Sequence, residues 1–166
     1  MFKRILVPLD GSAASTRALD TAIEMAKVHK SELYLFHVIS VDLLAEYEPI
    51  PDGRLARAKT LLVKQYDESA SSSDNPSEVE IFKDYKKSQG IAFLEDAKAS
   101  IPEGIVVQTG AEVGVPKHAI LEVAKRVEAD LIVMGRHGLS AVERFFLGSV
   151  CTYAVANAEC PVLVVK

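Results

Sequence analysis

Short runs of apolar residues recur along the chain, and each is followed by a polar or glycine-containing segment. Runs of this length and composition are typical of strands that are buried on both faces of a parallel sheet. We predict five such strands, at residues 5–7, 33–39, 105–107, 131–134 and 162–165. Between them, apolar residues recur every three or four positions, as in amphipathic helices. The alternation predicts an α/β fold: a single-domain, open, five-stranded parallel sheet with right-handed crossovers and helices on both faces.

Two of the predicted helices have recognisable first turns. Ser12 is suited to cap a helix over residues 13–29, because its hydroxyl can accept a hydrogen bond from a free backbone N–H group. Pro116 fits the first turn of a second helix, where its missing N–H group costs nothing. The inner face of the first helix would carry Ala14, Ala18, Ala22, Met25 and Ala26. The inner face of the second would carry Ile120, Val123, Ala124 and Val127.

The region from about 40 to 104 has a weaker pattern, and we interpret it as a variable insert or linker within a single domain that spans 1–166. One helix is indicated by Leu55, Ala58, Leu62 and Tyr66, and another by Ile91, Leu94, Lys98 and Ile101. The serine-rich stretch 69–77 is interpreted as a surface linker, with a phosphorylation site as the alternative. Residues 79–82 are apolar enough to predict an additional edge strand.

Composition narrows the class of protein. The chain has 166 residues, of which 49% are hydrophobic and 25% charged, as in a typical globular domain. Its formal net charge of -4 is unfavourable for a broad nucleic-acid-binding surface, so we expect no nucleic-acid partner. Cys151 and Cys160 are too few for a disulfide framework, and we interpret both as core residues in a reducing compartment. The N-terminal apolar run is too short for a signal peptide or membrane span, so we expect a cytoplasmic location without membrane association.

Candidate chemistry follows two of the predicted strands. In open parallel sheets, ligands bind beyond the carboxyl ends of the strands. The first strand is followed by Asp10-Gly11-Ser12, and the fourth by Gly135-Arg136-His137-Gly138. The first turn lacks the Gly-x-Gly-x-x-Gly pattern of dinucleotide sites, and no Gly-x-x-x-x-Gly-Lys-Ser/Thr phosphate loop occurs. A phosphate site, if present, would therefore use the turn after the fourth strand.

Gly148 and Ser149 extend this turn into a candidate phosphate cradle. Glycines allow backbone N–H groups to approach a ligand closely, and a helix N-terminus adds free N–H groups and a positive dipole. An alternative is one uninterrupted amphipathic helix through Val142, Phe145, Phe146, Ser149, Val150 and Tyr153. Because a glycine inside that helix would cost about 1 kcal/mol, we favour a helix that begins at Ser149.

Both ends of the chain resemble the universal stress protein family. Residues 4–12 are similar to its N-terminus and residues 113–166 to its C-terminal half, whereas 40–104 lacks identifying residues. The spacing Gly-x2-Gly-x9-Gly-Ser matches the motif of the ATP-binding branch. The resemblance implies a Rossmann-like fold related to the adenine nucleotide alpha hydrolases. It also implies that the chain binds ATP, with Mg²⁺ accompanying the phosphates.

The resemblance further implies a set of nucleotide-binding residues. These are Pro8, Leu9, Asp10, Val38, Met134, Gly135, Arg136, His137, Gly138, Gly148, Ser149 and Val150. Asp10 would contact the adenosine and Val38 would contribute backbone contacts, while Gly138 and the Gly148–Val150 segment would hold phosphates. Arg136 and His137 occupy the variable pair of the motif, where an arginine can add a charged phosphate contact. No catalytic or metal-ligating set is assigned, since the sequence lacks Ser/His/Asp, paired-acid and metal-ligand spacings.

The function expected from these observations is that of a nucleotide-dependent homodimer in stress response or signalling. Members of the family commonly dimerise through the last strand, here 162–166, and the signalling protein that would receive the output is not identified by the sequence. One alternative is a slow ATPase or nucleotidyl-transfer enzyme on the same fold. A second alternative is a dimeric scaffold that binds no nucleotide.

Overall fold

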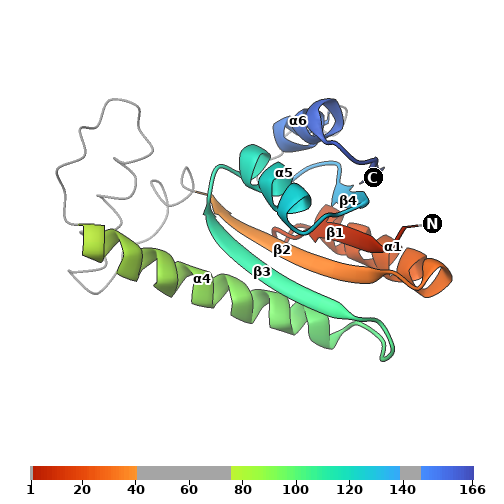
Figure 1. Ribbon diagram of the computed structural model, residues 1–166, viewed down its shortest axis with the longest axis horizontal. Helices are drawn as coiled ribbons and strands as arrows, with labels where there is room; N and C mark the ends of the chain where they lie inside the picture. Colours follow the sequence, from red (N-terminus) through yellow and green to blue (C-terminus); the bar gives the residue numbers. More distant parts are fainter. Residues whose placement is uncertain (1, 41–75, 139–146) are drawn as a thin grey trace.

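The computed structural model describes residues 2–40, 76–138 and 147–166. Within them, five parallel strands form one sheet in the order β3-β2-β1-β4-β5 (Figure 1). The strands are β1 (Arg4–Pro8), β2 (Glu32–Ser40), β3 (Val107–Gly114), β4 (Leu131–Gly135) and β5 (Val162–Val165). The helices are α1 (Ala13–His29), α4 (Pro76–Ala99), α5 (Pro116–Arg126) and α6 (Ser149–Asn157). The predicted α/β architecture is confirmed.

The direction in which strands are added reverses beside the central strand β1. From β1 the chain adds β2 and then β3 on one side, and then returns to add β4 and β5 on the other. Leu6 of β1 is accordingly in register with Tyr34 of β2 and with Ile132 of β4. In open α/β sheets this reversal opens a crevice beyond the carboxyl ends of the two diverging strands. Here those strands are β1 and β4.

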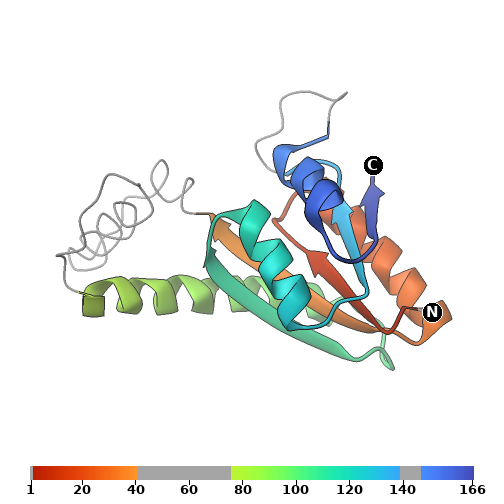
Figure 2. The same cartoon turned by 45° about the horizontal axis from the view of Figure 1, so that its top comes forward.

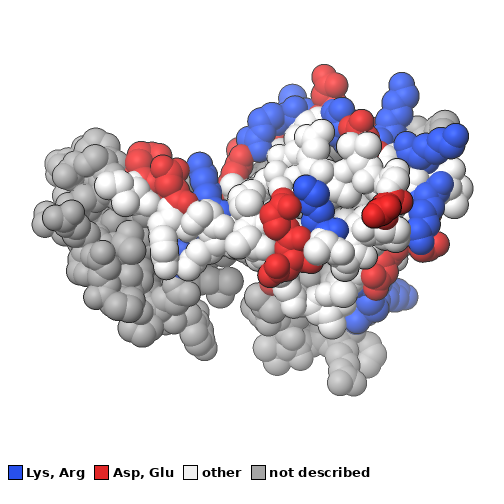
Figure 3. Space-filling model, turned by 90° about the horizontal axis from the view of Figure 1, so that it is seen from below, with Lys and Arg blue, Asp and Glu red and all other residues white. Residues whose placement is uncertain are grey.

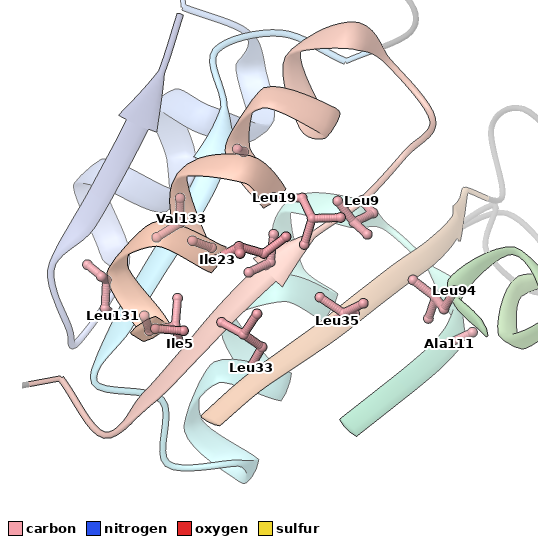
Figure 4. Close-up of a cluster of buried hydrophobic side chains, with 14 residues drawn as sticks. Ile5, Leu9, Leu19, Ile23, Leu33, Leu35, Leu94, Ala111, Leu131 and Val133 are labelled. Atoms are coloured by element: carbon pink, nitrogen blue, oxygen red, sulfur yellow. The ribbon is translucent and has the colours of Figure 1, made fainter. Parts of the chain in front are cut away.

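Alternate residues of the strands bury the two faces of the sheet in separate clusters. Ile5 and Val7 pack with α1 and with Leu94 of α4, in the cluster that Figure 4 shows. Leu6 and the fully buried Phe36 pack on the other face, against α5 and α6. Because side chains alternate between the two faces, α1 and α4 pack on one apolar layer, and α5 and α6 pack on the other. The strands are buried on both faces, so their sequences are continuous apolar runs.

Helix starts follow the signals in the sequence. The Ser12 hydroxyl accepts a hydrogen bond from the N–H group of Ser15 at 3.2 Å, so the predicted cap of α1 is confirmed. Pro116 lies in the first turn of α5, as predicted. The buried residues of α5 are Ala119, Ile120, Val123 and Ala124. Among the residues with described positions, no helix is long and apolar enough to span a membrane.

Two predictions for the middle of the chain are wrong. Residues 79–82 lie within α4 and form no edge strand, because a continuous helical ladder from Pro76 overrides their local preference for a strand. The third strand begins at Val107 and continues to Gly114, instead of covering 105–107, and Val106 is 57% exposed. The helix predicted around Leu94 is confirmed, although it is longer than expected. The helix predicted around residues 55–66 and most of the serine-rich stretch lie outside the described residues.

Helix α4 is longer than the part of the sheet that it covers. Figures 1 and 2 both show its Pro76 end extending beyond the sheet, while the end that carries Leu94 packs on β2 and β3. Ile81 and Tyr85, toward the extended end, are 61% and 42% exposed. On the face shown in Figure 3, basic and acidic side chains are interspersed.

Both cysteines are free thiols that contribute to the apolar layer of α5 and α6. Cys151 is buried and Cys160 is half-buried against the same cluster. Burial raises the pKa of both thiols, which keeps them protonated and unreactive at neutral pH. The interpretation of both as core residues is confirmed.

Candidate functional site

The loop from β1 to α1 is held in place by hydrogen bonds from its neighbours. The Leu9 N–H group donates to the Phe36 carbonyl at 2.8 Å, and His37 Nδ1 lies 2.8 Å from the Leu9 carbonyl oxygen. Asp10 Oδ1 accepts a hydrogen bond from the Ser12 N–H group at 3.0 Å, which closes a tight turn. The loop therefore presents the Asp10 carboxylate from a fixed position at the carboxyl end of β1.

The turn after β4 lies directly against this loop. A Cβ atom on Gly138 would lie 2.7 Å from Asp10 Oδ2, and one on Gly135 would lie 2.7 Å from the backbone carbonyl carbon of Ala14. The Ser12 hydroxyl donates to the His137 carbonyl oxygen at 3.5 Å. Two segments more than a hundred residues apart thus meet at the reversal of strand order. The missing side chains of the glycines are what allows this approach.

Helix α6 begins beside the same turn. Gly148 is its N-cap residue, with φ -60° and ψ 153°, and no side chain caps the helix. The Gly148 N–H group donates to the Arg136 carbonyl oxygen at 3.0 Å, which fastens the helix start to the turn after β4. The preference for a helix that begins at Ser149 is confirmed, while 139–146 lie outside the described residues. The first N–H groups of α6 and its dipole are available to an anion.

The other members of the predicted site lie around this junction. Pro8 ends β1, and Met134 is a buried residue of β4. Val38 lies in β2, two residues beyond the Phe36 that is in register with Pro8. Its side chain packs in the layer of α5 and α6 together with that of Val150, whereas Ser149 is exposed. The structure brings Asp10, Gly138 and the start of α6 together, and it gives Val38 no described contact with them.

Two residues that the sequence analysis did not place at the site support its loop. The rings of His37 and Phe93 are in edge-to-face contact, with centroids 5.1 Å apart. Phe93, from α4, also lies 3.9 Å from where a Cβ atom of Gly11 would be. Gly11 has a φ of +84°, a conformation that favours glycine. No local signal indicates these contacts, because they join three separate segments of the chain.

A groove lies elsewhere on the molecule. It has a volume of about 520 Å³ and lies between the carboxyl ends of α5 and α6, near Cys160. These helix ends precede the starts of β4 and β5, so the groove is at the opposite end of the sheet from Asp10 and Gly138. Nor do the described residues contain any cluster of three or more His, Cys, Asp or Glu side chains that could hold a metal ion.

Comparisons with known proteins agree with this architecture. A sequence profile described as the Universal stress protein family matches residues 1–166. Universal stress protein MJ0531 of Methanocaldococcus jannaschii is 34% identical over 168 residues, which cover 100% of this chain and 83% of that protein. The solved universal stress protein UspA from Lactobacillus plantarum is 25% identical, with a TM-score of 0.66 over 99% of this chain and 97% of the other.

Two solved proteins of the same fold contain nucleotides. A universal stress protein in complex with cAMP is 24% identical, with a TM-score of 0.58 over 99% of this chain and 97% of the other. A universal stress protein from Archaeoglobus fulgidus in complex with dAMP is 21% identical, with a TM-score of 0.51 over 99% of this chain and 98% of the other. At these identities the likeness to this chain is one of fold.

Proposed function

The chain belongs to the universal stress protein family, and on that premise we propose that it binds ATP in the crevice between β1 and β4. The observation that carries the proposal is the close approach of the Asp10 carboxylate to Gly138. It joins the acidic loop after β1 to the glycine turn after β4, where the strand order reverses. The complexes with cAMP and dAMP are precedents for an adenine nucleotide in this fold.

The residues fit a nucleotide with its phosphates toward α6. Gly138 and Gly148 add no side chains of their own at the turn, and the uncapped start of α6 offers N–H groups to a phosphate. Asp10 lies on the opposite side of the turn, where a carboxylate can accept hydrogen bonds from adenosine. Mg²⁺ would be brought by the phosphates themselves.

A bound nucleotide would act by shifting the protein between states that bind it with different affinity. We place this activity in stress response or signalling in the cytoplasm, with a protein partner that responds to the nucleotide-bound state. The direct test is to denature the purified protein and identify any released nucleotide by chromatography, and then to titrate the emptied, refolded protein with Mg·ATP by calorimetry. Released ATP or ADP, or binding of one ATP per subunit, supports the proposal. Refolded protein with native circular dichroism that neither releases nor binds a nucleotide contradicts it.

Asp10→Ala is expected to weaken the binding of ATP and ADP alike. A hydrogen bond to a charged group contributes about 1.5–3 kcal/mol, so the loss should be about tenfold to a hundredfold for each nucleotide. Calorimetric titration of both nucleotides checks this, with Asp20→Ala, an exposed residue of α1, as the matched control. A loss confined to ATP would assign Asp10 to the phosphates instead of the adenosine.

We also propose that two copies of the chain pair through β5. This strand has four residues and forms the end of the sheet beside β4, so its outer edge is open to a second strand. The Ile132 N–H group donates to the Pro161 carbonyl and that of Arg136 to the Val165 carbonyl. By the alternation of a parallel ladder, the N–H and carbonyl groups of Val164 then point away from β4. Two such edges related by a twofold axis are complementary to each other.

Val164→Pro is expected to convert the dimer into a monomer without unfolding it. Proline removes the outward N–H group of Val164 and takes no hydrogen bond from the ladder with β4. Sedimentation velocity measures the change in mass, and circular dichroism with thermal unfolding reports whether the fold is retained. Wild-type protein that is monomeric at micromolar concentration would contradict the proposed dimer, and a folded variant that stays dimeric would place the interface elsewhere.

A further inference from the structure

The carbonyl group of Leu9 is bonded to a side chain at the point where a continued strand would give it a backbone N–H group. The ladder between β1 and β2 ends at the pair of Pro8 and Phe36, and its last bond runs from the Leu9 N–H group to the Phe36 carbonyl. The next bond of a parallel ladder would join the Val38 N–H group to the Leu9 carbonyl. Among the described residues that bond is absent, and His37 Nδ1 lies 2.8 Å from the Leu9 carbonyl oxygen instead.

The imidazole of His37 is the donor in this contact, and α4 holds it in place. A carbonyl oxygen can only accept a hydrogen bond, so Nδ1 carries a proton. The ring is in edge-to-face contact with Phe93, with centroids 5.1 Å apart. A Cβ atom on Gly90 would lie 3.2 Å from Cδ2 of the imidazole. The missing side chain of Gly90 therefore leaves the room that the ring occupies between α4 and the loop after β1.

The backbone of Val38 is left without a partner on the side of β1. The Leu33 N–H group donates to the Val106 carbonyl, so the odd-numbered residues of β2 direct their backbone groups toward β3. By the same alternation, Val38 directs its N–H and carbonyl groups toward β1. In the part of the chain that the structure describes, nothing accepts a hydrogen bond from this N–H group. The crevice beyond β1 is thus bordered on the side of β2 by a free backbone donor.

The same contact orients the start of the acidic loop. A peptide group is planar, so a fixed Leu9 carbonyl also fixes the Asp10 N–H group in the same plane. That N–H group donates to the Ser15 hydroxyl at 3.4 Å, and the Asp10 carboxylate accepts from the Ser12 N–H group at 3.0 Å. The imidazole of His37 therefore determines both how β1 separates from β2 and where the loop that carries Asp10 begins.

We propose that His37 is a positioning residue of the nucleotide site: it holds the end of β1 away from β2 and so keeps the Val38 backbone free for the nucleoside part of the ligand. The inference rests on the proposed nucleotide site and adds the residue that opens it. Without the imidazole, the Leu9 carbonyl would lack a partner, and the next donor of the ladder is the Val38 N–H group. A bond between them would extend the ladder and draw the loop that carries Asp10 toward β2.

The first test needs no nucleotide. Hydrogen exchange of the full-length protein, followed by NMR, compares the Val38 amide with the Phe36 amide, which lies within the ladder with β1. In wild type the Val38 amide should exchange at least about tenfold faster. In His37→Leu it should become about tenfold slower, because it then bonds the Leu9 carbonyl. Equal protection of the two amides in wild type, or an unchanged Val38 amide in the folded variant, would overturn the inference.

The second test measures the affinity for adenosine and for Mg·ATP by calorimetry. His37→Leu is expected to weaken both by about tenfold, as for the loss of one or two neutral hydrogen bonds. His37→Asn should stay within about threefold of wild type, because the asparagine amide can place a donor where Nδ1 lies. His29→Leu is the matched control. His29 lies in the last turn of α1 and is in edge-to-face contact with Phe2, and its substitution should change neither affinity.

The affinities separate the possible roles of His37. Unchanged affinities in His37→Leu, or a loss in His37→Asn as large as that in His37→Leu, would overturn the inference, since the hydrogen bond would then position nothing. A loss for ATP without a loss for adenosine would overturn it as well, because the effect would belong to the phosphates. Wild-type protein that binds neither ligand would overturn the proposed function, whereas the exchange of the Val38 amide would still show whether His37 holds β1 away from β2.

Discussion

Gly138→Val is expected to remove measurable binding of ATP while the protein stays folded. The first carbon of the new side chain would lie 2.7 Å from Asp10 Oδ2, so the carboxylate has to move. The remaining methyl groups would add further bulk at the turn beside Asp10. If ATP loses two charge-assisted hydrogen bonds to the protein, its affinity decreases by at least about a hundredfold. The cost to the fold is small, because the displaced group is the end of one half-buried side chain.

The measurement is calorimetric titration with Mg·ATP, accompanied by thermal unfolding and sedimentation. Gly138→Ala is the milder form of the same change, and Gly114→Ala is its matched control. A Cβ atom on Gly114 would lie 3.9 Å from its nearest neighbour, which is an ordinary contact. Gly114→Ala should therefore bind ATP as wild type does. Normal ATP affinity in Gly138→Val would place the phosphates away from this turn.

Gly135→Ala is expected to lower the stability of the fold itself. Its Cβ atom would lie 2.7 Å from the carbonyl carbon of Ala14 and 2.9 Å from the carbonyl oxygen. Backbone cannot rotate away as the end of a side chain can, so the first turn of α1 has to separate from β4. Overpacking of this kind costs about 1–3 kcal/mol, and a domain of this size loses about 2–4 °C in Tm for each kcal/mol.

Denaturant unfolding of Gly135→Ala and Gly114→Ala, side by side, checks this prediction. The first variant should unfold at lower denaturant concentration than wild type, and the second should unfold at about the wild-type concentration. ATP affinity should also fall in Gly135→Ala, because Ser12 and Asp10 precede the turn that moves. If the two variants are equally stable, α1 and β4 are not in close contact at Gly135.

The fold was largely predictable because each buried strand has its own apolar run. The exception is β3, whose residues from Gln108 to Gly114 carry little apolar character. Strand β3 pairs with β2 along the whole stretch from Leu33 to Ser40. The extent of β3 is therefore set by this pairing more than by its own composition. For residues 79–82 the prediction fails in the other direction. Their apolar character suits a strand, but they lie within the long helix α4.

The sequence predicts the two loops of the candidate site, but not the contact between them. The glycine spacing and Ser12 identify the two loops, because strand ends and helix caps are local properties. The contact of Asp10 with Gly138, by contrast, depends on β4 lying beside β1, which no local pattern states. The same holds for Phe93, whose position against Gly11 follows from the path of α4 across the sheet.

Through Phe93, which contacts His37 and lies close to Gly11, α4 touches the loop that carries Asp10. The helix has 24 residues, and its Pro76 end extends beyond the sheet. The part of α4 from Phe93 to Pro76 is about 26 Å long, given a rise of about 1.5 Å per residue. A tilt of about 5° at the loop would thus carry the far end through about 2 Å. Any tilt of α4 about its contact with the loop would therefore be largest at the Pro76 end, which lies beyond the sheet.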